Sequence, residues 1–157
     1  MKTVNLQHSA AFIAAATIIA IAAMAPLSVS AKSPTANVTI VNSGSIFTLG
    51  YTIVVSRSGY ASYTSEGSSG TVTLPAGLVR KLFADIAASR PLGNLPSTNC
   101  LKSDRYGSFT HISLASDRSP DVSCPGNDRT TALMADAQQI AVAAHVDQLP
   151  RKPTRVR

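Results

Sequence analysis

Alternating and β-branched positions predict short strands in the first half of the chain. Four runs are rich in Val, Ile, Thr and Tyr, which favour pleated and half-buried segments: residues 38–41, 50–56, 60–65 and 71–74. Arg57-Ser58-Gly59 separates the second run from the third. A glycine at the third turn position supplies the positive φ of a three-residue hairpin. The sequence therefore predicts one hairpin with a shorter strand on each side.

Two later segments repeat apolar residues at helical spacing. The first begins at Pro75, because proline is tolerated in a first helical turn, and its apolar stripe is Leu78, Val79, Leu82, Phe83 and Ile86. The second is expected to be capped by Asn127 or Asp128 and stopped by Pro150. Its apolar stripe is Leu133, Met134, Ala137, Ile140, Ala141 and Ala144.

Between these helices, residues 108–115 alternate polar and apolar positions with period two, which predicts a strand. Residues 121–124 are expected to return beside it as a partner strand. Strand pairs interrupted by helices indicate an α+β fold. We therefore predict an antiparallel sheet built from two hairpins, with two helices packed on one face.

The first 31 residues have the pattern of a secretory signal peptide. Lys2 gives a positive start, residues 10–24 form an apolar run, and Val29-Ser30-Ala31 resembles a cleavage site. The apolar run is shorter than the roughly twenty residues that span a bilayer. We expect a cleaved signal peptide at 1–31, a single α+β domain at 32–149 and a disordered basic tail at 150–157. The mature protein is then exported, to the periplasm or outside the cell.

The positive charge of the chain is concentrated at its C-terminal end. Residues 32–149 carry nine Lys and Arg against eight Asp and Glu, whereas the tail PRKPTRVR adds four basic residues. A nucleic-acid-binding fold needs a basic face on the domain itself, so nucleic acid is not an expected partner. The tail at 150–157 is expected to make at most weak contacts with anionic envelope surfaces, and no stable membrane insertion is expected after signal cleavage.

The run YTIVVSRSGYASYTSEGSSGTVTLPAGLVRKLFADI joins the hairpin to the first helix. Together with the second hairpin and helix, roughly residues 38–145, it resembles a domain family of unknown function in exported bacterial proteins. That family has a strand of type "ysltI", a glycine turn, a "tv.Y.g" strand and a "ls.e.v.kLl..l" helix. An Asp-Gly turn is common there, where this chain has Arg57-Ser58-Gly59. The resemblance implies the fold and an exported setting, and it supplies no catalytic residue.

The two cysteines of the chain, Cys100 and Cys124, both follow the expected cleavage site. An exported chain enters an oxidising compartment, where an even number of cysteines indicates disulfides. We predict a structural disulfide that closes about 25 residues and stabilises the fold by roughly 3–4 kcal/mol. Two distant cysteines without a CxxC motif or paired histidines do not supply a zinc site, so no metal and no cofactor are expected.

The segment PSTNCLKSDRYGSFTH, residues 96–111, concentrates polar side chains without a recognised catalytic pattern. The sequence contains no GxSxG, SxxK, HExxH or P-loop motif. His111 falls on the solvent-facing side of its expected strand. We assign no catalytic residue, and keep Arg105, Tyr106 and His111 as a candidate surface contact patch.

Three classes of function are compatible with these features. The favoured hypothesis is a non-enzymatic exported domain that binds a protein, a glycan or a small molecule. An alternative is a small secreted hydrolase that uses His111 with a nearby serine, Ser108 or Ser113. A third class is an inhibitor or accessory subunit of another envelope protein, because a small disulfide-tied sheet with an exposed edge can pair with a partner.

We predict that the exported protein begins at Lys32. The small residues before this position fit a signal peptidase site. The intact mass of the exported species checks the prediction, and a mass that retains residues 1–31 would identify an uncleaved anchor instead.

Overall fold

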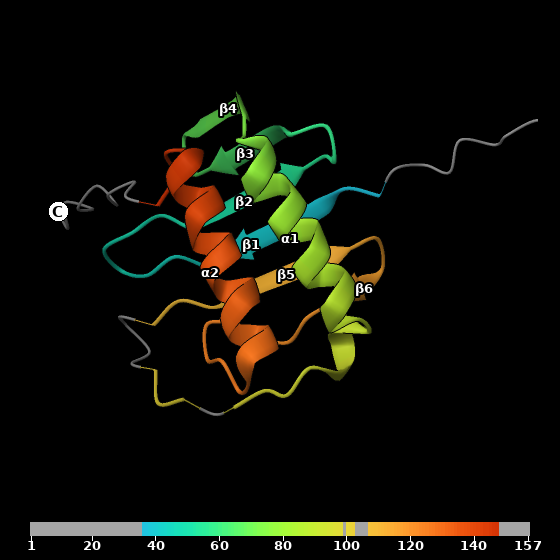
Figure 1. Ribbon diagram of the computed structural model, residues 1–157. Helices are drawn as coiled ribbons and strands as arrows, with labels where there is room; N and C mark the ends of the chain where they lie inside the picture. The colour runs from blue at the N-terminus through green and yellow to red at the C-terminus, as the bar shows by residue number, and fades with distance from the viewer. Residues whose placement is uncertain (1–35, 99, 103–106, 148–157) are drawn as a thin grey trace, which may run out of the picture. The chain divides into compact units, whose positions relative to one another are not determined.

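The computed structural model describes residues 36–98, 100–102 and 107–147, which form six strands, two α-helices and one 3-10 turn. The strands are β1 (Val38–Asn42), β2 (Tyr51–Val55), β3 (Tyr60–Ser65), β4 (Ser68–Thr73), β5 (Thr110–Leu114) and β6 (Asp117–Arg118). The helices are α1 (Ala76–Ser89), η1 (Leu92–Asn94) and α2 (Asp128–Ala143). All strand pairs are antiparallel, in the spatial order β4-β3-β2-β1-β5-β6 (Figure 1). The predicted α+β class is confirmed.

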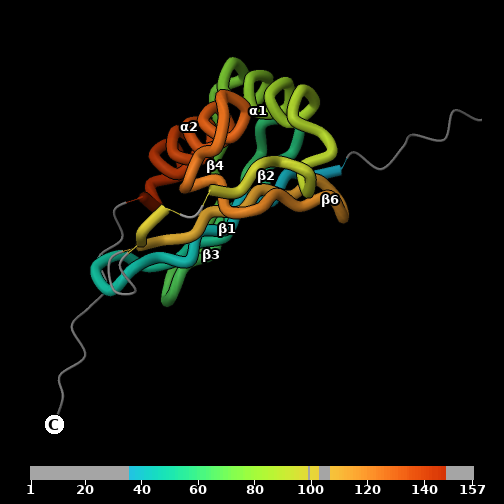
Figure 2. The backbone as a smooth tube through the Cα atoms, turned by 90° about the horizontal axis from the view of Figure 1, so that it is seen from below, coloured from blue at the N-terminus to red at the C-terminus, as the bar shows by residue number. Residues whose placement is uncertain are grey.

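The helices α1 and α2 lie side by side on one face of the sheet, as Figure 2 shows from below. Alternate residues of the strands point into this layer, so Ile40, Ile53 and Ile112 are fully buried. The helices contribute their apolar stripes, with Leu82, Ile86, Leu133 and Ile140 also fully buried. The core is therefore a single layer between sheet and helices, and no helix of the described residues covers the other face of the sheet.

The uncovered face of the sheet carries mainly Thr, Ser and Val side chains. Thr39 pairs with Val54 across β1 and β2, and Thr52 pairs with Thr64 across β2 and β3. His111 lies on this face, opposite Val41. These side chains are half-buried or exposed, as expected for β-branched residues that stabilise a sheet through cross-strand contacts.

Several of the elements begin or end at the turn and capping residues that the sequence predicts. Gly59 has a φ of +91° in the turn between β2 and β3, as the three-residue hairpin requires. Pro75 immediately precedes α1. Asn127 caps α2 in a reciprocal arrangement, because its side chain accepts from the Thr130 amide and the Thr130 hydroxyl accepts from the Asn127 amide, both at 3.0 Å.

The second predicted hairpin is wrong in its return strand. Residues 121–124 form a turn, and the partner of β5 is the two-residue strand β6. The cause is the Asp121 carboxylate, which accepts hydrogen bonds from the main-chain amides of Thr110 and Ser123 at 2.9 and 3.0 Å. Such side-chain bonds replace those that a strand ladder would make.

Two element boundaries also differ from the prediction. Strand β4 begins at Ser68 rather than residue 71, because Glu66 and Gly67 alone make the turn and Gly67 has a φ of +74°. Helix α2 ends at Ala143, well before Pro150, and His145 adopts a φ of +58° just after it. Neither α-helix in the described part of the chain has the length and apolar character of a membrane-spanning segment.

One ionic cluster ties the two helices together. The Lys81 ammonium of α1 lies 2.5 Å from Asp136 Oδ1 of α2 and 2.7 Å from Asp85 Oδ2. Asp136 is fully buried, and its Oδ2 has no hydrogen-bond partner among the described residues. Burial raises the pKa of Asp136 above its ordinary value; the hydrogen bond from Lys81 opposes this, and the neighbouring Asp85 carboxylate adds to it. The Lys81 hydrogen bond instead lowers the pKa of Asp85.

These opposite shifts predict opposite pH dependences for two variants. The pKa of Asp136 is higher in the folded state than the value of 3.8 in the unfolded state. The folded protein therefore loses stability as pH rises from 3.8 through the folded-state pKa. Asp136→Asn, which mimics the protonated carboxyl, should therefore become increasingly more stable than the wild type as pH rises above about 4. The difference should level off once Asp136 of the wild type is fully ionised, because the asparagine carries no buried negative charge.

Asp85→Asn is the matched control. A lowered pKa contributes stability that is present above 3.8 and lost as pH falls, so this variant should be less stable than the wild type at neutral pH and equal to it in acid. Urea unfolding of the three proteins from pH 3 to pH 7 measures both trends. Parallel pH curves for Asp136→Asn and the wild type would contradict the assignment to Asp136.

Candidate functional site

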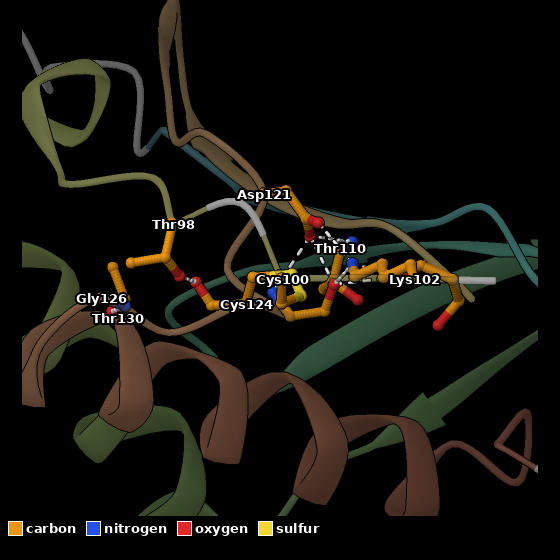
Figure 3. Close-up of a disulfide and its surroundings, with 10 residues drawn as sticks. Thr98, Cys100, Lys102, Thr110, Asp121, Cys124, Gly126 and Thr130 are labelled. Atoms are coloured by element: carbon orange, nitrogen blue, oxygen red, sulfur yellow. Dashed lines mark hydrogen bonds and ion pairs between the residues drawn. A yellow bond between two sulfur atoms is a disulfide. The ribbon is translucent and has the colours of Figure 1, made fainter. Parts of the chain in front are cut away.

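Part of the polar segment singled out in the sequence contacts the turn at 121–125, through Ser97, Thr98, Cys100 and Lys102. Cys100 and Cys124 form a disulfide, with their Cα atoms 5.7 Å apart. Beside it, the Thr98 hydroxyl donates to the Cys124 carbonyl at 2.8 Å (Figure 3). Ser97 pairs with Pro125 in an isolated antiparallel bridge. The disulfide and this bridge therefore join the segment that contains Cys100 to the turn that contains Cys124.

A polar network continues from the disulfide toward β5. The Lys102 ammonium donates to the Asp121 carboxylate and to the Ser123 hydroxyl, and also to the Ser108 carbonyl at 2.6 Å. Its nitrogen lies 4.5 Å from the centre of the Phe109 ring, within the range of a cation–π contact. The Lys102 side chain is only 15% exposed, so these partners replace most of its hydration.

The charge state of Asp121 shows what this network does. Partial burial opposes ionisation, but hydrogen bonds from Lys102, Ser123 and the main-chain amide of Thr110 outweigh it and lower the pKa of Asp121 to about 2. The carboxylate is therefore ionised throughout the neutral range and forms an ion pair with Lys102. A lysine that acts as a base toward a serine must be uncharged, whereas this lysine and serine are both bound to an ionised carboxylate.

The candidate residues from the sequence do not gather into one site in the described part of the chain. The Nδ1 atom of the His111 ring lies 3.1 Å from the Ser119 carbonyl oxygen. Among the described residues, this contact is the hydrogen bond of the His111 side chain. Ser113 lies on the uncovered sheet face, opposite Thr39. Arg105 and Tyr106 lie outside the described residues. No group of His, Cys, Asp and Glu side chains with metal-binding geometry occurs within the described ranges.

The loop between β1 and β2, residues 43–50, is a feature that the sequence analysis missed. Its two ends touch at Gly44 and Gly50: a Cβ on Gly44 would lie 2.4 Å from the Gly50 nitrogen, and Gly44 has a φ of +69°. Within the loop, the Ser45 hydroxyl accepts from the amides of Phe47 and Thr48 at 3.1 and 3.2 Å. The loop is thus closed at its base and held internally by hydrogen bonds.

This loop presents apolar side chains to solvent. Ile46 is 45% exposed and Phe47 is 61% exposed. Phe109, 51% exposed, lies next to the base of this loop, since its main chain is joined to Ser43 by hydrogen bonds of 3.0 and 2.9 Å. We refer to residues 43–50 together with Phe109 as the loop-end surface. Residues 36–56 contain no charged side chain, so apolar contact is the main interaction that this loop offers.

A cavity of about 450 Å³ lies beside the loop-end surface, bounded by the loop, the start of β2 and the second half of α2. Its apolar wall includes Leu49 and Met134, and its polar wall includes Tyr51, Gln138 and Asp147. Burial, followed by the negative charge of Asp147, raises the pKa of Tyr51 to about 12. The Tyr51 phenol therefore keeps its proton and is a hydrogen-bond donor at neutral pH.

A signal for this surface was present in the sequence. Two glycines enclose an adjacent Ile-Phe pair in a stretch without charges, which is unusual for a solvent-exposed loop. The contact between Gly44 and Gly50, however, depends on backbone geometry that has no periodic pattern.

No family model, no curated protein and no solved structure matches the chain. The resemblance to a family of exported bacterial domains therefore remains a prediction.

We predict that the disulfide stabilises the fold without serving any binding activity. The double variant Cys100→Ser, Cys124→Ser should lower the free energy of unfolding by up to about 3–4 kcal/mol, because it releases a loop of 24 residues in the unfolded state. Calorimetry with and without reductant measures the effect, and the reduced wild type should behave like the variant. Two thiols that react rapidly with a labelling reagent in the native protein would contradict the prediction.

Proposed function

We propose that this chain is an exported, non-enzymatic domain that binds another protein through the loop-end surface. The observation that carries the proposal is the closed loop at 43–50, which displays Ile46 and Phe47 on a backbone fixed by its own hydrogen bonds. A fixed loop loses little conformational entropy on binding. Exposed aromatic side chains are also enriched among the residues that dominate binding energy.

An exported setting agrees with the chemistry of the described residues. The Cys100–Cys124 disulfide is of the kind that persists in oxidising compartments. The basic tail at 150–157 and the signal peptide at 1–31 lie outside the described residues, and they enter the proposal from the sequence alone. Periplasmic and extracellular locations are both compatible with it.

Binding is favoured over catalysis by the roles of the polar side chains. The Lys102–Asp121–Ser123 network and the His111 ring both bond to main-chain groups around β5. These contacts hold Ser108 and the start of β5 against the turn at 121–124. They support the base of the loop-end surface, because Phe109 lies directly before β5 and its main chain is bonded to Ser43.

The loop-end surface suits a partner protein with a concave apolar pocket. The absence of charge in residues 36–56 disfavours a polyanionic ligand, and the exposed side chains project beside a cavity that could receive a small group from the partner. Insertion of a fixed loop into a pocket is a geometry expected of an inhibitor or an accessory subunit. We therefore propose an inhibitor or an accessory subunit as the class of function that the loop-end surface favours.

Site-specific photo-crosslinking in the exporting host tests this proposal. A photoreactive phenylalanine analogue at Phe47 should crosslink a discrete partner protein, whereas the same analogue at Tyr60 should not. Tyr60 is a matched control, because it is an exposed aromatic residue of similar exposure, 54%, on β3. With the purified partner, Phe47→Ala should weaken binding by about 30-fold, as for a residue that dominates an interface, and Tyr60→Ala should change it little. Equal crosslinking at both positions, or an unchanged Kd for Phe47→Ala, would overturn the proposal.

A further inference from the structure

The two edges of the sheet differ sharply in composition. At one edge, β6 has only two residues, Asp117 and Arg118, and Asp117 is bonded to the Arg90 side chain and the Gly93 amide at 3.2 Å. At the other edge, β4 has six residues, Ser68–Thr73, with no charge and no proline. Natural edge strands are usually short, charged or covered, because exposed main-chain groups invite pairing with another strand. Only β6 has these protections.

The hydrogen bonds of β4 show which of its groups point outward. The Leu74 amide donates to the Gly59 carbonyl of the neighbouring segment at 2.8 Å. Main-chain groups of successive residues alternate between the two sides of an antiparallel strand, so residues 68, 70, 72 and 74 bond toward β3. The amides and carbonyls of Ser69, Thr71 and Thr73 therefore point away from the sheet, and no strand in the described ranges lies beyond them (Figure 1).

We propose that β4 is a self-association surface, at which two copies of this chain join their sheets in antiparallel fashion. The twofold axis is perpendicular to the sheet, so the helices of both copies lie on the same side. With Thr71 opposite Thr71 of the second copy, Ser69 pairs with Thr73 of the second copy. This register uses all three outward-pointing residues of each strand and gives six main-chain hydrogen bonds. Registers shifted by two residues use fewer of these outward-pointing residues.

Charge complementarity favours a second copy as the occupant of this edge. In the same register, Glu66 of one chain lies opposite Ala76 of the other, at the start of α1. The first turn of α1 contains no acidic residue, and Pro75 provides no side-chain cap. A carboxylate is stabilised near the partly positive N-terminus of a helix. Each copy therefore supplies the acidic group that the other copy's helix lacks, and the neutral strands bring no like charges together.

This inference is independent of the proposed function, because Ile46, Phe47 and Phe109 take no part in it. Phe47→Ala should leave self-association unchanged, and charged substitutions in β4 should leave the loop-end surface intact. The failure of one proposal is thus distinguishable from the failure of the other.

A pair of charge variants of the mature protein tests the register. In Ser69→Lys, Thr73→Lys, equal charges face each other across the axis; in Ser69→Lys, Thr73→Glu, opposite charges do. Both variants change the same two exposed positions, so their folds should be equally preserved, which circular dichroism and thermal unfolding verify. Sedimentation is measured at protein concentrations from about 1 μM to about 1 mM, a range that includes the Kd expected for the weak association of a small interface. The wild type should form dimers, and the Kd of the two variants should differ about tenfold.

Hydrogen exchange of the wild type gives a second readout that needs no variant. The amides of Ser69, Thr71 and Thr73 should exchange more slowly as the protein concentration rises, while the amides of β6 should not change. A monomeric wild type at all concentrations overturns the proposal. Equal behaviour of the two charge variants overturns it as well, because it would assign any dimer to another surface.

Discussion

Burial of one face of the sheet beneath α1 and α2 is the interaction on which the remaining features depend. Ile40, Ile53 and Ile112 are fully buried on that face, and each removes apolar area from water worth about 1.5–3 kcal/mol. A single helical layer can cover only one side of a sheet. The two ends of the sheet, its two edges and its uncovered face therefore lie outside this buried layer.

Two carboxylates near this layer differ in how well their charge is stabilised. At the start of β5, Asp121 is ionised and surrounded by donors, so it holds a turn that has little regular secondary structure. Between the helices, Asp136 is fully buried with one oxygen unpaired, and Lys81 satisfies only the other. The first carboxylate stabilises its folded surroundings in neutral solution. The second is retained although burial disfavours its charge.

The parts of the fold that could be predicted are those set by residues close together in sequence. Gly59 determined the β2–β3 turn, Pro75 the start of α1 and Asn127 the cap of α2. The turn at 121–124 was not predictable in this way, because the Asp121 side chain competes for the amides that a ladder would use. The loop-end surface depends on contacts between Ser43 and Phe109, 66 positions apart, which no local pattern encodes.

The contact between Gly44 and Gly50 also restricts how the loop can change over evolution. A side chain at Gly44 would collide with the backbone of the other end of the loop. Substitution of Gly44 is therefore excluded more strongly than substitution in an ordinary surface loop. Related chains that keep both glycines could acquire new partners by exchanging Ile46, whose side chain is 45% exposed, on an unaltered backbone.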